Sequence, residues 1–251
     1  MGDRLQKVLS KWGIASRRQA EAMILEGRVL LNGKVAELGQ RADPEQDQIC
    51  VDGQLLGLSQ RPATRYILLN KPAGVVSTCR DPQGRATVLD LLPPPLARCQ
   101  GLHPVGRLDA YSTGALLMTN DGEFTFRLTH PSHHIAKVYR VTVEGHPSTT
   151  TLDTWRSGVP LEGRLTQPAK VRSLQRRQAS TVLEVILCEG RNRQIRRVAA
   201  QLGHPVKRLH RHSIGPVRLG GLASGHSRSL TPSELKAITL MFEPKPSQTS
   251  E

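Results

Sequence analysis

The chain is poor in cysteine. It has four, at positions 50, 79, 99 and 188, and none is part of a C-x-x-C pair. Zinc knuckles are built from closely spaced ligands, so this spacing argues against such a site and favours a reducing, cytoplasmic setting. His130, His133 and His134 lie close together, but no acidic or cysteine partner completes a zinc signature around them. We therefore expect no metal.

Long apolar runs are also missing. No stretch approaches the ~18 residues that a membrane span requires, and no basic amphipathic anchor is evident. Charged residues separate Leu5, Val8 and Leu9, which excludes the apolar core of a signal peptide. Aromatic residues make up only 3% of the chain, yet a hydrophobic content of 37% suffices for a folded core. We expect no membrane partner.

Acidic residues are outnumbered. The 35 Lys and Arg residues exceed the 21 Asp and Glu residues, which gives a net charge of +14 and a pI near 10.4. A basic excess of this size is typical of proteins that bind a polyanion, and nucleic acid is the first candidate.

Residues 1–60 form a compact pattern of two short helices and a small sheet. Asp3 is the expected cap of the first helix, and Ser16 opens the second with Gln19 placed for a capping box. The Asn32-Gly33 and Asp52-Gly53 pairs predict type I′ hairpin turns. We expect residues 59–64 to form a linker to a second domain.

The outward face of this module is basic. Such a run is as often a merely solvated helix face, but Ser16-Arg17-Arg18 stands at a helix start, where backbone N–H groups and guanidinium forks together suit a phosphate. The expected RNA-contacting residues here are Arg4, Lys7, Arg17, Arg18 and Arg28.

The segment 106–122, GRLDAYSTGALLMTNDG, stands at the centre of the remaining chain. Arg107 and Asp109 flank one leucine, and the apolar run 115–118 predicts a buried strand that ends in an Asn-Asp-Gly turn. A carboxylate beside a guanidinium at the mouth of a core strand can be kept ionised. On spacing alone, a surface ion pair leading into a hairpin is the more frequent arrangement.

The other segments predict an α+β domain over residues 65–243 with a mixed, mainly antiparallel sheet. A proline triplet is expected to stop a short helix or turn at 88–92, and residues 244–251 should form a disordered tail. Strands are expected at 66–70, 138–144, 170–174 and 181–187, and helices at 124–128, 149–157 and 194–202.

Several of these segments together resemble the bacterial ribosomal RNA pseudouridine synthases of the RsuA/RluB group. The GRLD segment is accompanied by Asn70–Val75 (NKPAGV), by Lys137-Val138-Tyr139 and by Glu189–Arg197 (EGRNRQIRR), in the family's order. The N-terminal pattern, K-V-L-S-x-x-G-x-x-S-R-R followed by G-x-V-x-x-N-G, resembles the S4-like RNA-binding domain. Tyr111 and Ala115 depart from the residues that the family more often has there.

The resemblance implies a chemistry and a set of catalytic residues. It implies that a uridine in ribosomal RNA is isomerised to pseudouridine without a cofactor, after the base has been flipped out of the RNA. Asp109 would attack or stabilise the sugar or base, Arg196 would keep that carboxylate ionised, and Tyr139 would stack on the uracil and take the C5 proton. Arg107 would contact a phosphate or wedge beside the opened base.

Basic residues in the second domain complete the expected RNA surface: Lys71, Arg191, Arg193, Arg197, Arg208 and Arg211. The partner would be ribosomal RNA or an assembling particle, more often of the large subunit, and the protein a monomer. One alternative is a non-catalytic RNA-binding or ribosome-assembly protein with the same fold. Another is a glycosidase-like hydrolase with Asp109 and Asp121 as its acid pair, which we expect to lie too far apart.

Overall fold

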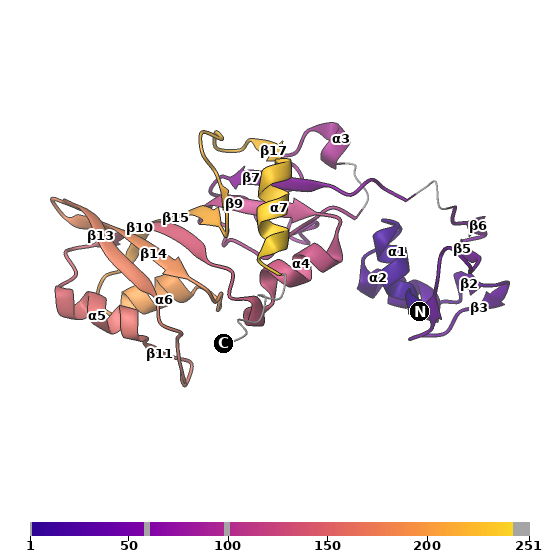
Figure 1. Cartoon of the computed structure of the whole chain (residues 1–251), viewed down its shortest axis with the longest axis horizontal. Helices are drawn as coiled ribbons and strands as arrows, with labels where there is room; N and C mark the ends of the chain where they lie inside the picture. The colour runs from indigo at the N-terminus through magenta and orange to yellow at the C-terminus, as the bar shows by residue number, and fades with distance from the viewer. Residues whose placement is uncertain (1, 58–60, 98–100, 243–251) are drawn as a thin grey trace, which may run out of the picture.

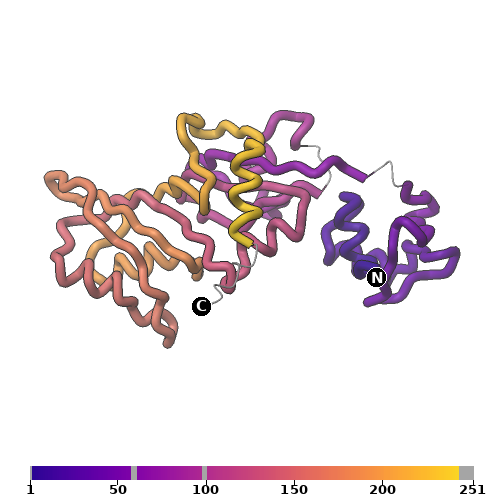
Figure 2. Tube along the Cα trace, viewed as in Figure 1, coloured from indigo at the N-terminus to yellow at the C-terminus, as the bar shows by residue number. Residues whose placement is uncertain are grey.

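The computed structural model describes residues 2–57, 61–97 and 101–242. Figures 1 and 2 show a small N-terminal body next to a longer body built on one large sheet. Each body has its own buried apolar cluster. The expected linker lies partly outside the described residues, and the expected tail lies wholly outside them.

Two helices pack on a small antiparallel sheet in the N-terminal body. The sheet has the strand order β3-β2-β5-β6. Leu5, Leu9 and Trp12 form its core with residues of the second helix and of β2 and β5. The elements are β1 (Asp3–Arg4), α1 (Leu5–Lys11), α2 (Arg17–Leu25), β2 (Val29–Leu31), β3 (Lys34–Val35), β4 (Arg41–Ala42), β5 (Ile49–Val51) and β6 (Gln54–Leu55).

The local signals for this body were correct except at the first helix. Ser16 and Gln19 form the complete capping box, and both hairpin turns have positive φ at their two central residues, which is the type I′ signature. Asp3 does not cap α1: Arg4 occupies that position without a side-chain cap. The Asp3 carboxylate instead binds the ammonium groups of Lys7 and Lys11, both at 2.6 Å.

The longer body is organised by a mixed, mainly antiparallel sheet with the order β13-β14-β10-β15-β9-β7-β17. All the neighbours in this order pair antiparallel except β15 and β9, which run parallel over two residue pairs. The strands are β7 (Tyr66–Lys71), β9 (Thr113–Thr119), β10 (Lys137–Glu144), β13 (Lys170–Arg177), β14 (Ser180–Leu187), β15 (Val206–Ile214) and β17 (Ser227–Ser229). Short strands β8 (His103–Pro104) and β16 (Val217–Arg218) pair with β9 and β15, and β11 (Pro160–Leu161) pairs with β12 (Arg164–Leu165).

Helices pack against the sheet, and the sheet is buried on both faces around β7 and β9. Alternate residues of β9 enter different cores, Leu116 and Met118 one and Ala115 and Leu117 the other, because successive side chains of a strand point to opposite faces. This explains the continuous apolar run at the centre of the sequence. Figure 1 places α5 and α6 with the β10–β14 half, and α4 and α7 with the β7–β9 half. The helices are α3 (Pro94–Ala97), α4 (Gly122–Thr129), the 3-10 turn η2 (Pro131–His133), α5 (Thr149–Ser157), α6 (Gln194–Gln201) and α7 (Pro232–Leu240).

Two further segments can be compared with the expectations. Residues 88–92 form a turn, one of the two expected forms, and Pro94 then begins helix α3, because proline fits the first turn, where its missing N–H is not needed. The basic stretch 207–218, to which no structure was assigned, comprises most of the central strand β15, a turn and the short strand β16.

Candidate active site

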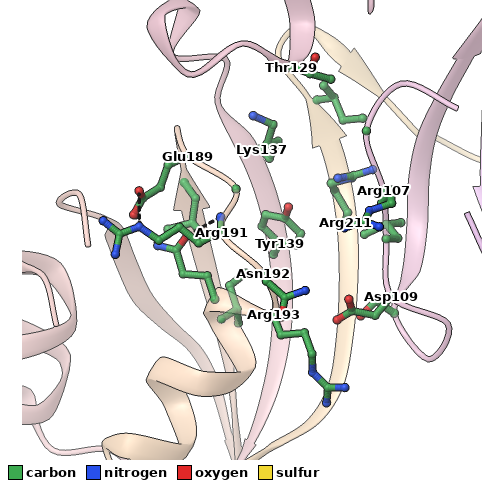
Figure 3. A pocket seen from close by; sticks show the side chains of 18 of the residues that line it. Arg107, Asp109, Thr129, Lys137, Tyr139, Glu189, Arg191, Asn192, Arg193 and Arg211 are labelled. Carbon is green, nitrogen blue, oxygen red and sulfur yellow. Dashed lines mark hydrogen bonds and ion pairs between the residues drawn. The ribbon is translucent and has the colours of Figure 1, made fainter. Parts of the chain in front are cut away.

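A cavity of about 370 Å³ opens beside the β9–β15 junction. Figure 3 shows Tyr139 on β10 between two groups of side chains, with Arg107 and Asp109 on one side and the 191–193 turn on the other. The volume of the cavity is within the usual range for small-ligand sites. The structure thus brings six of the expected site residues to one cavity: Arg107, Asp109, Tyr139, Arg191, Arg193 and Arg211.

Asp109 stands on a tight turn that the backbone holds in place. The Ser112 N–H donates to the Asp109 carbonyl at 3.0 Å. One residue earlier, the Ser77 hydroxyl donates to the Leu108 carbonyl at 2.9 Å, and the Leu108 N–H lies 3.2 Å from the Ser77 Oγ atom. The carboxylate, 36% exposed, therefore projects from a fixed loop at the mouth of the cavity.

Arg196 reaches this carboxylate from helix α6. Its Nε atom lies 3.8 Å from Asp109 Oδ2, and one terminal nitrogen donates to the Ser112 hydroxyl at 3.3 Å. Burial lowers the pKa of the guanidinium, and the neighbouring Asp109 charge acts in the opposite direction. The Asp109 carboxylate therefore faces a partly buried positive charge.

Lys71 lies beneath the same loop, and this corrects its expected role. Its side chain is completely buried, and its Nζ donates to the carbonyls of Pro72, Ala110 and Ser112 at 2.8–3.0 Å. Burial lowers its pKa to about 8, although the Asp109 charge opposes this shift. An ammonium enclosed in this way cannot reach an RNA phosphate; it fixes the segment that carries Asp109.

The wall formed by β10 and β15 contributes Tyr139, Lys137 and Arg211. Tyr139 is only 9% exposed and lines the cavity. Arg211 is 4% exposed; its Nε donates to the Ala115 carbonyl at 2.7 Å, while one terminal nitrogen is buried without a partner. Burial and the adjacent Arg211 both lower the pKa of Lys137. The cavity thus gathers several basic side chains around two carboxylates, Asp109 and Glu189.

The turn before α6 is shaped by its own side chains. Glu189 accepts hydrogen bonds from Gln194 and from the Gln167 N–H, at 2.6 and 2.8 Å. The guanidinium of Arg191 donates to the carbonyls of Leu161, Arg164 and Leu165, which fix its position at the cavity; its contact with RNA stays a prediction. Arg193, which precedes the helix with φ 48°, is exposed at the cavity.

The remaining basic residues that we predicted do not line the cavity. Several are already paired: Lys7 with Asp3, Arg28 with Asp52 and Glu26, and Arg197 with Glu162. Arg17 lies beside Gly122 at the start of α4. Arg4, Arg18 and Arg208 are exposed. The predicted basic face of the first helix is therefore partly neutralised by its own acids.

Asp121 cannot act as a second acid beside Asp109. Its carboxylate caps α4 through the N–H groups of Glu123 and Phe124 and accepts the Tyr66 hydroxyl at 2.8 Å. Strand β9 separates the two carboxylates by about 20 Å at ~3.3 Å per residue. This distance rules out the glycosidase arrangement.

Some cavity residues were missed from sequence. Lys137 and Asn192 lie within the motifs quoted above, so the sequence already indicated that they belong near the site. His130 stood out in the sequence as part of a histidine cluster but was not assigned to the site, and Thr129 gave no signal, because the packing of α4 brings both to the cavity. Within the described ranges, no group of three or more His, Cys, Asp or Glu residues could hold a metal, and no helix is long and apolar enough to cross a membrane.

Comparisons with known proteins agree with this geometry. The family model described as RNA pseudouridylate synthase matches residues 65–201, and the S4 domain model matches residues 3–49. A Bacillus subtilis protein named ribosomal large subunit pseudouridine synthase B is 41% identical, covering 96% of this chain and 97% of its own. An Aquifex aeolicus protein named as an uncharacterized RNA pseudouridine synthase is 40% identical, also covering 96% of this chain and 97% of its own. A crystal structure of a pseudouridylate synthase aligns over 94% of this chain and 99% of its own, with a TM-score of 0.67 and 32% identity.

Proposed function

The chain belongs to the RNA pseudouridylate synthase family, and from this premise we propose that it converts a specific uridine of ribosomal RNA, in the large subunit, into pseudouridine. The name of the B. subtilis relative supports the choice of subunit. The basic N-terminal body with its S4 match supports an RNA substrate. One geometric observation carries the assignment of the chemistry: the Asp109 carboxylate lies 3.8 Å from the Arg196 guanidinium at the mouth of a cavity walled by Tyr139.

The proposed reaction is an internal rearrangement. The N1–C1′ bond of the uridine breaks, the uracil turns, and a C5–C1′ bond forms; the C5 proton leaves and N1 gains a proton. No oxidant, reductant or group donor is needed, so the reaction calls for no cofactor. The sugar acquires oxocarbenium character when the first bond breaks, and a carboxylate on its face stabilises or captures that charge.

Each proposed role follows from the place of the side chain. Asp109 is the nucleophile or stabilising anion. Arg196 places a positive charge 3.8 Å from that carboxylate. Tyr139 presents its ring to the uracil and its hydroxyl to the C5 proton, which suits a general base. The target base is extruded from the RNA into the cavity, and Arg107 at its rim contacts the opened strand.

The basic residues that remain unpaired extend this proposal to RNA binding. Arg4 and Arg18 on the N-terminal body, with Arg193 and Arg208 on the longer body, would hold phosphates. We further propose that the protein acts as a monomer in the cytoplasm. Light scattering of the purified protein, alone and with RNA, tests the oligomeric state.

The decisive experiment compares the wild type with Asp109→Asn. Each protein is incubated with unmodified rRNA fragments of both subunits, and pseudouridine is mapped by carbodiimide-blocked reverse transcription. We expect a single new stop in a large-subunit fragment with the wild type and none with the variant. Salt-sensitive RNA binding without a stop on any RNA or precursor particle would instead favour a non-catalytic RNA-binding protein.

A further inference from the structure

A connected group of aromatic rings lies at the end of α4. The Phe126 ring centroid is 4.8 Å from that of His130 and 5.9 Å from that of His133, and the two histidine rings are 5.8 Å apart. Phe242 extends the group at 5.3 Å from His133. We call Phe126, His130 and His133 the aromatic platform.

The platform is open to solvent at its centre. Phe126 is 51% exposed, whereas Phe124, two residues earlier, packs inward with its ring 4.7 Å from that of Tyr66. Residues two apart on a helix point to nearly opposite sides, so Phe126 cannot join the core that α4 covers. The chain has only three phenylalanines, and two of them belong to this ring group. A single exposed apolar residue is ordinary, but contiguous exposed rings indicate a binding surface.

Hydrogen bonds hold the two imidazoles in place without any ligand. His130 Nδ1 accepts the Ser132 N–H at 3.3 Å and lies 2.6 Å from the Ser132 hydroxyl. His133 Nδ1 donates to the Arg127 carbonyl at 2.6 Å. Because the rings are fixed beforehand, little side-chain entropy is lost when a flat partner stacks on them.

The platform is continuous with the active-site cavity. Thr129, His130 and Pro131 line the same cavity as Asp109, so His130 belongs to both surfaces. A nucleotide chain that places one base in the cavity would carry its next unpaired bases over His130 towards Phe126. The surroundings are basic: Arg107 lies at the cavity rim, and the Arg127 guanidinium is 5.8 Å from the centre of the Phe242 ring.

We propose that the aromatic platform binds unpaired RNA bases next to the target uridine by stacking. The inference rests on the proposed function and adds a part of the substrate that the cavity does not hold. RNA sequences are read mostly in single-stranded loops, where splayed bases stack on aromatic side chains. Every base has a π-face, so such a surface tolerates different sequences while favouring an unpaired strand. The chain's net charge of +14 favours this polyanion over a protein partner.

The first test uses the full chain and a stem-loop RNA that contains the uridine modified by the wild type. Phe126→Ala removes the central ring, Phe126→Tyr retains a stacking ring, and Leu174→Ala removes another exposed apolar side chain, on β13. We expect Phe126→Ala to weaken RNA binding by on the order of tenfold. The other two variants should bind within about twofold of the wild type. For Phe126→Ala the single-turnover rate at saturating RNA should stay near the wild-type value, because Phe126 itself does not line the cavity of Asp109.

A second test identifies the partner of the ring. Abasic nucleotides are placed one at a time beside the target uridine, and affinities are measured with the wild type and with Phe126→Ala. At the position that stacks on the platform, the wild type should bind the abasic RNA on the order of tenfold more weakly than the intact RNA. Phe126→Ala should bind the intact and the abasic RNA with equal affinity, because the stacking partner is already absent. Thermal unfolding of both proteins checks that the fold is unchanged.

The outcomes separate the two proposals. If the wild type forms no pseudouridine in any RNA, the proposed function fails. If it forms pseudouridine and Phe126→Ala binds the RNA as tightly as the wild type, the platform does not bind RNA and would instead suit a protein partner. The inference would also be overturned if, at every position, the loss of binding free energy from the abasic nucleotide simply added to the loss from Phe126→Ala.

Discussion

The Arg196 Nε atom lies 3.8 Å from Asp109 Oδ2, although α6 and the Asp109 loop belong to opposite halves of the sheet. The same guanidinium also donates to the Ser112 hydroxyl at 3.3 Å and to the Val206 carbonyl at 3.5 Å. It therefore links the loop of the carboxylate to the start of β15. The ion pair is both an electrostatic and a positional element of the site.

Replacing Arg196 should reduce turnover more than RNA binding. We expect Arg196→Met to lower kcat on the order of a hundredfold, because the charge that faces Asp109 is lost where it is most effective. Arg196→Lys should recover part of this loss. Arg197→Met is the matched control, because Arg197 is the next residue in the chain and its side chain pairs with the exposed Glu162. A wild-type kcat for Arg196→Met would show that the ion pair has no catalytic role.

Substitutions at Tyr139 separate the hydroxyl from the ring. Tyr139→Phe should lower kcat on the order of a hundredfold with little change in KM, as for the loss of a general base. Uridine deuterated at C5 should then react more slowly than ordinary uridine with this variant. Tyr139→Leu should also raise KM, because the stacking surface is gone. Equal kcat for the wild type and Tyr139→Phe would assign the C5 proton to another acceptor.

Lys71 should make the stability depend on pH in an alkaline window. Its pKa is about 8 in the folded protein, below the ordinary value of 10.5. Between these values the unfolded chain binds more protons, so the free energy of unfolding rises with pH. The gain should reach about 3 kcal/mol at pH 10.5.

Urea unfolding of the wild type and Lys71→Met between pH 7 and 11 measures this contribution. At neutral pH the free energy of unfolding of the variant should be lower than that of the wild type by at least about 3 kcal/mol, because three buried carbonyls lose their donor. The difference between the two proteins should grow with pH and level off above pH 10.5. A difference that stays constant from pH 7 to 11 would contradict the shifted pKa.

Two arginines of the N-terminal body should differ in their contribution to RNA binding. Arg28 donates to both oxygens of Asp52 at 2.7 Å, whereas Arg18 is exposed at the start of α2. Arg18→Ala should therefore reduce the salt slope of log K by about one, and Arg28→Ala should change it much less. Fluorescence anisotropy at several salt concentrations measures both slopes. Equal slopes for the two variants would show that Arg28 exchanges Asp52 for a phosphate.

Local signals in the sequence were the most reliable guide. The Ser16 capping box and the Asn32-Gly33 turn were predictable because each depends on residues within one turn of the chain. Helix α7 carried an equally clear signal, the Thr231–Glu234 capping box with proline at its first position, which was overlooked. The family motifs led to Asp109, Tyr139 and Arg196.

What the sequence could not reveal depends on contacts between distant segments. Lysine is almost never fully buried, so the place of Lys71 follows only from three carbonyls that two separate segments bring together. The central strand β15 is rich in basic residues and does not resemble a core strand, yet β10 and β9 enclose it. Thr129 and His130 reach the cavity only through the packing of α4.

The parallel junction between β15 and β9 comprises two residue pairs, His210 with Thr113 and Arg211 with Gly114. At Gly114 the φ is +108°, and a Cβ there would meet the Arg211 backbone, so only glycine lets the strands approach this closely. Asp109 is attached to one half of the sheet and Tyr139 to the other. The site is thus assembled across a junction of two residue pairs, over one apolar cluster that takes Leu116 and Met118 from one half of the sheet and Val141 and Leu183 from the other. A substitution that loosens this junction would shift Asp109 relative to Tyr139, so catalysis should be more sensitive to it than the content of secondary structure is.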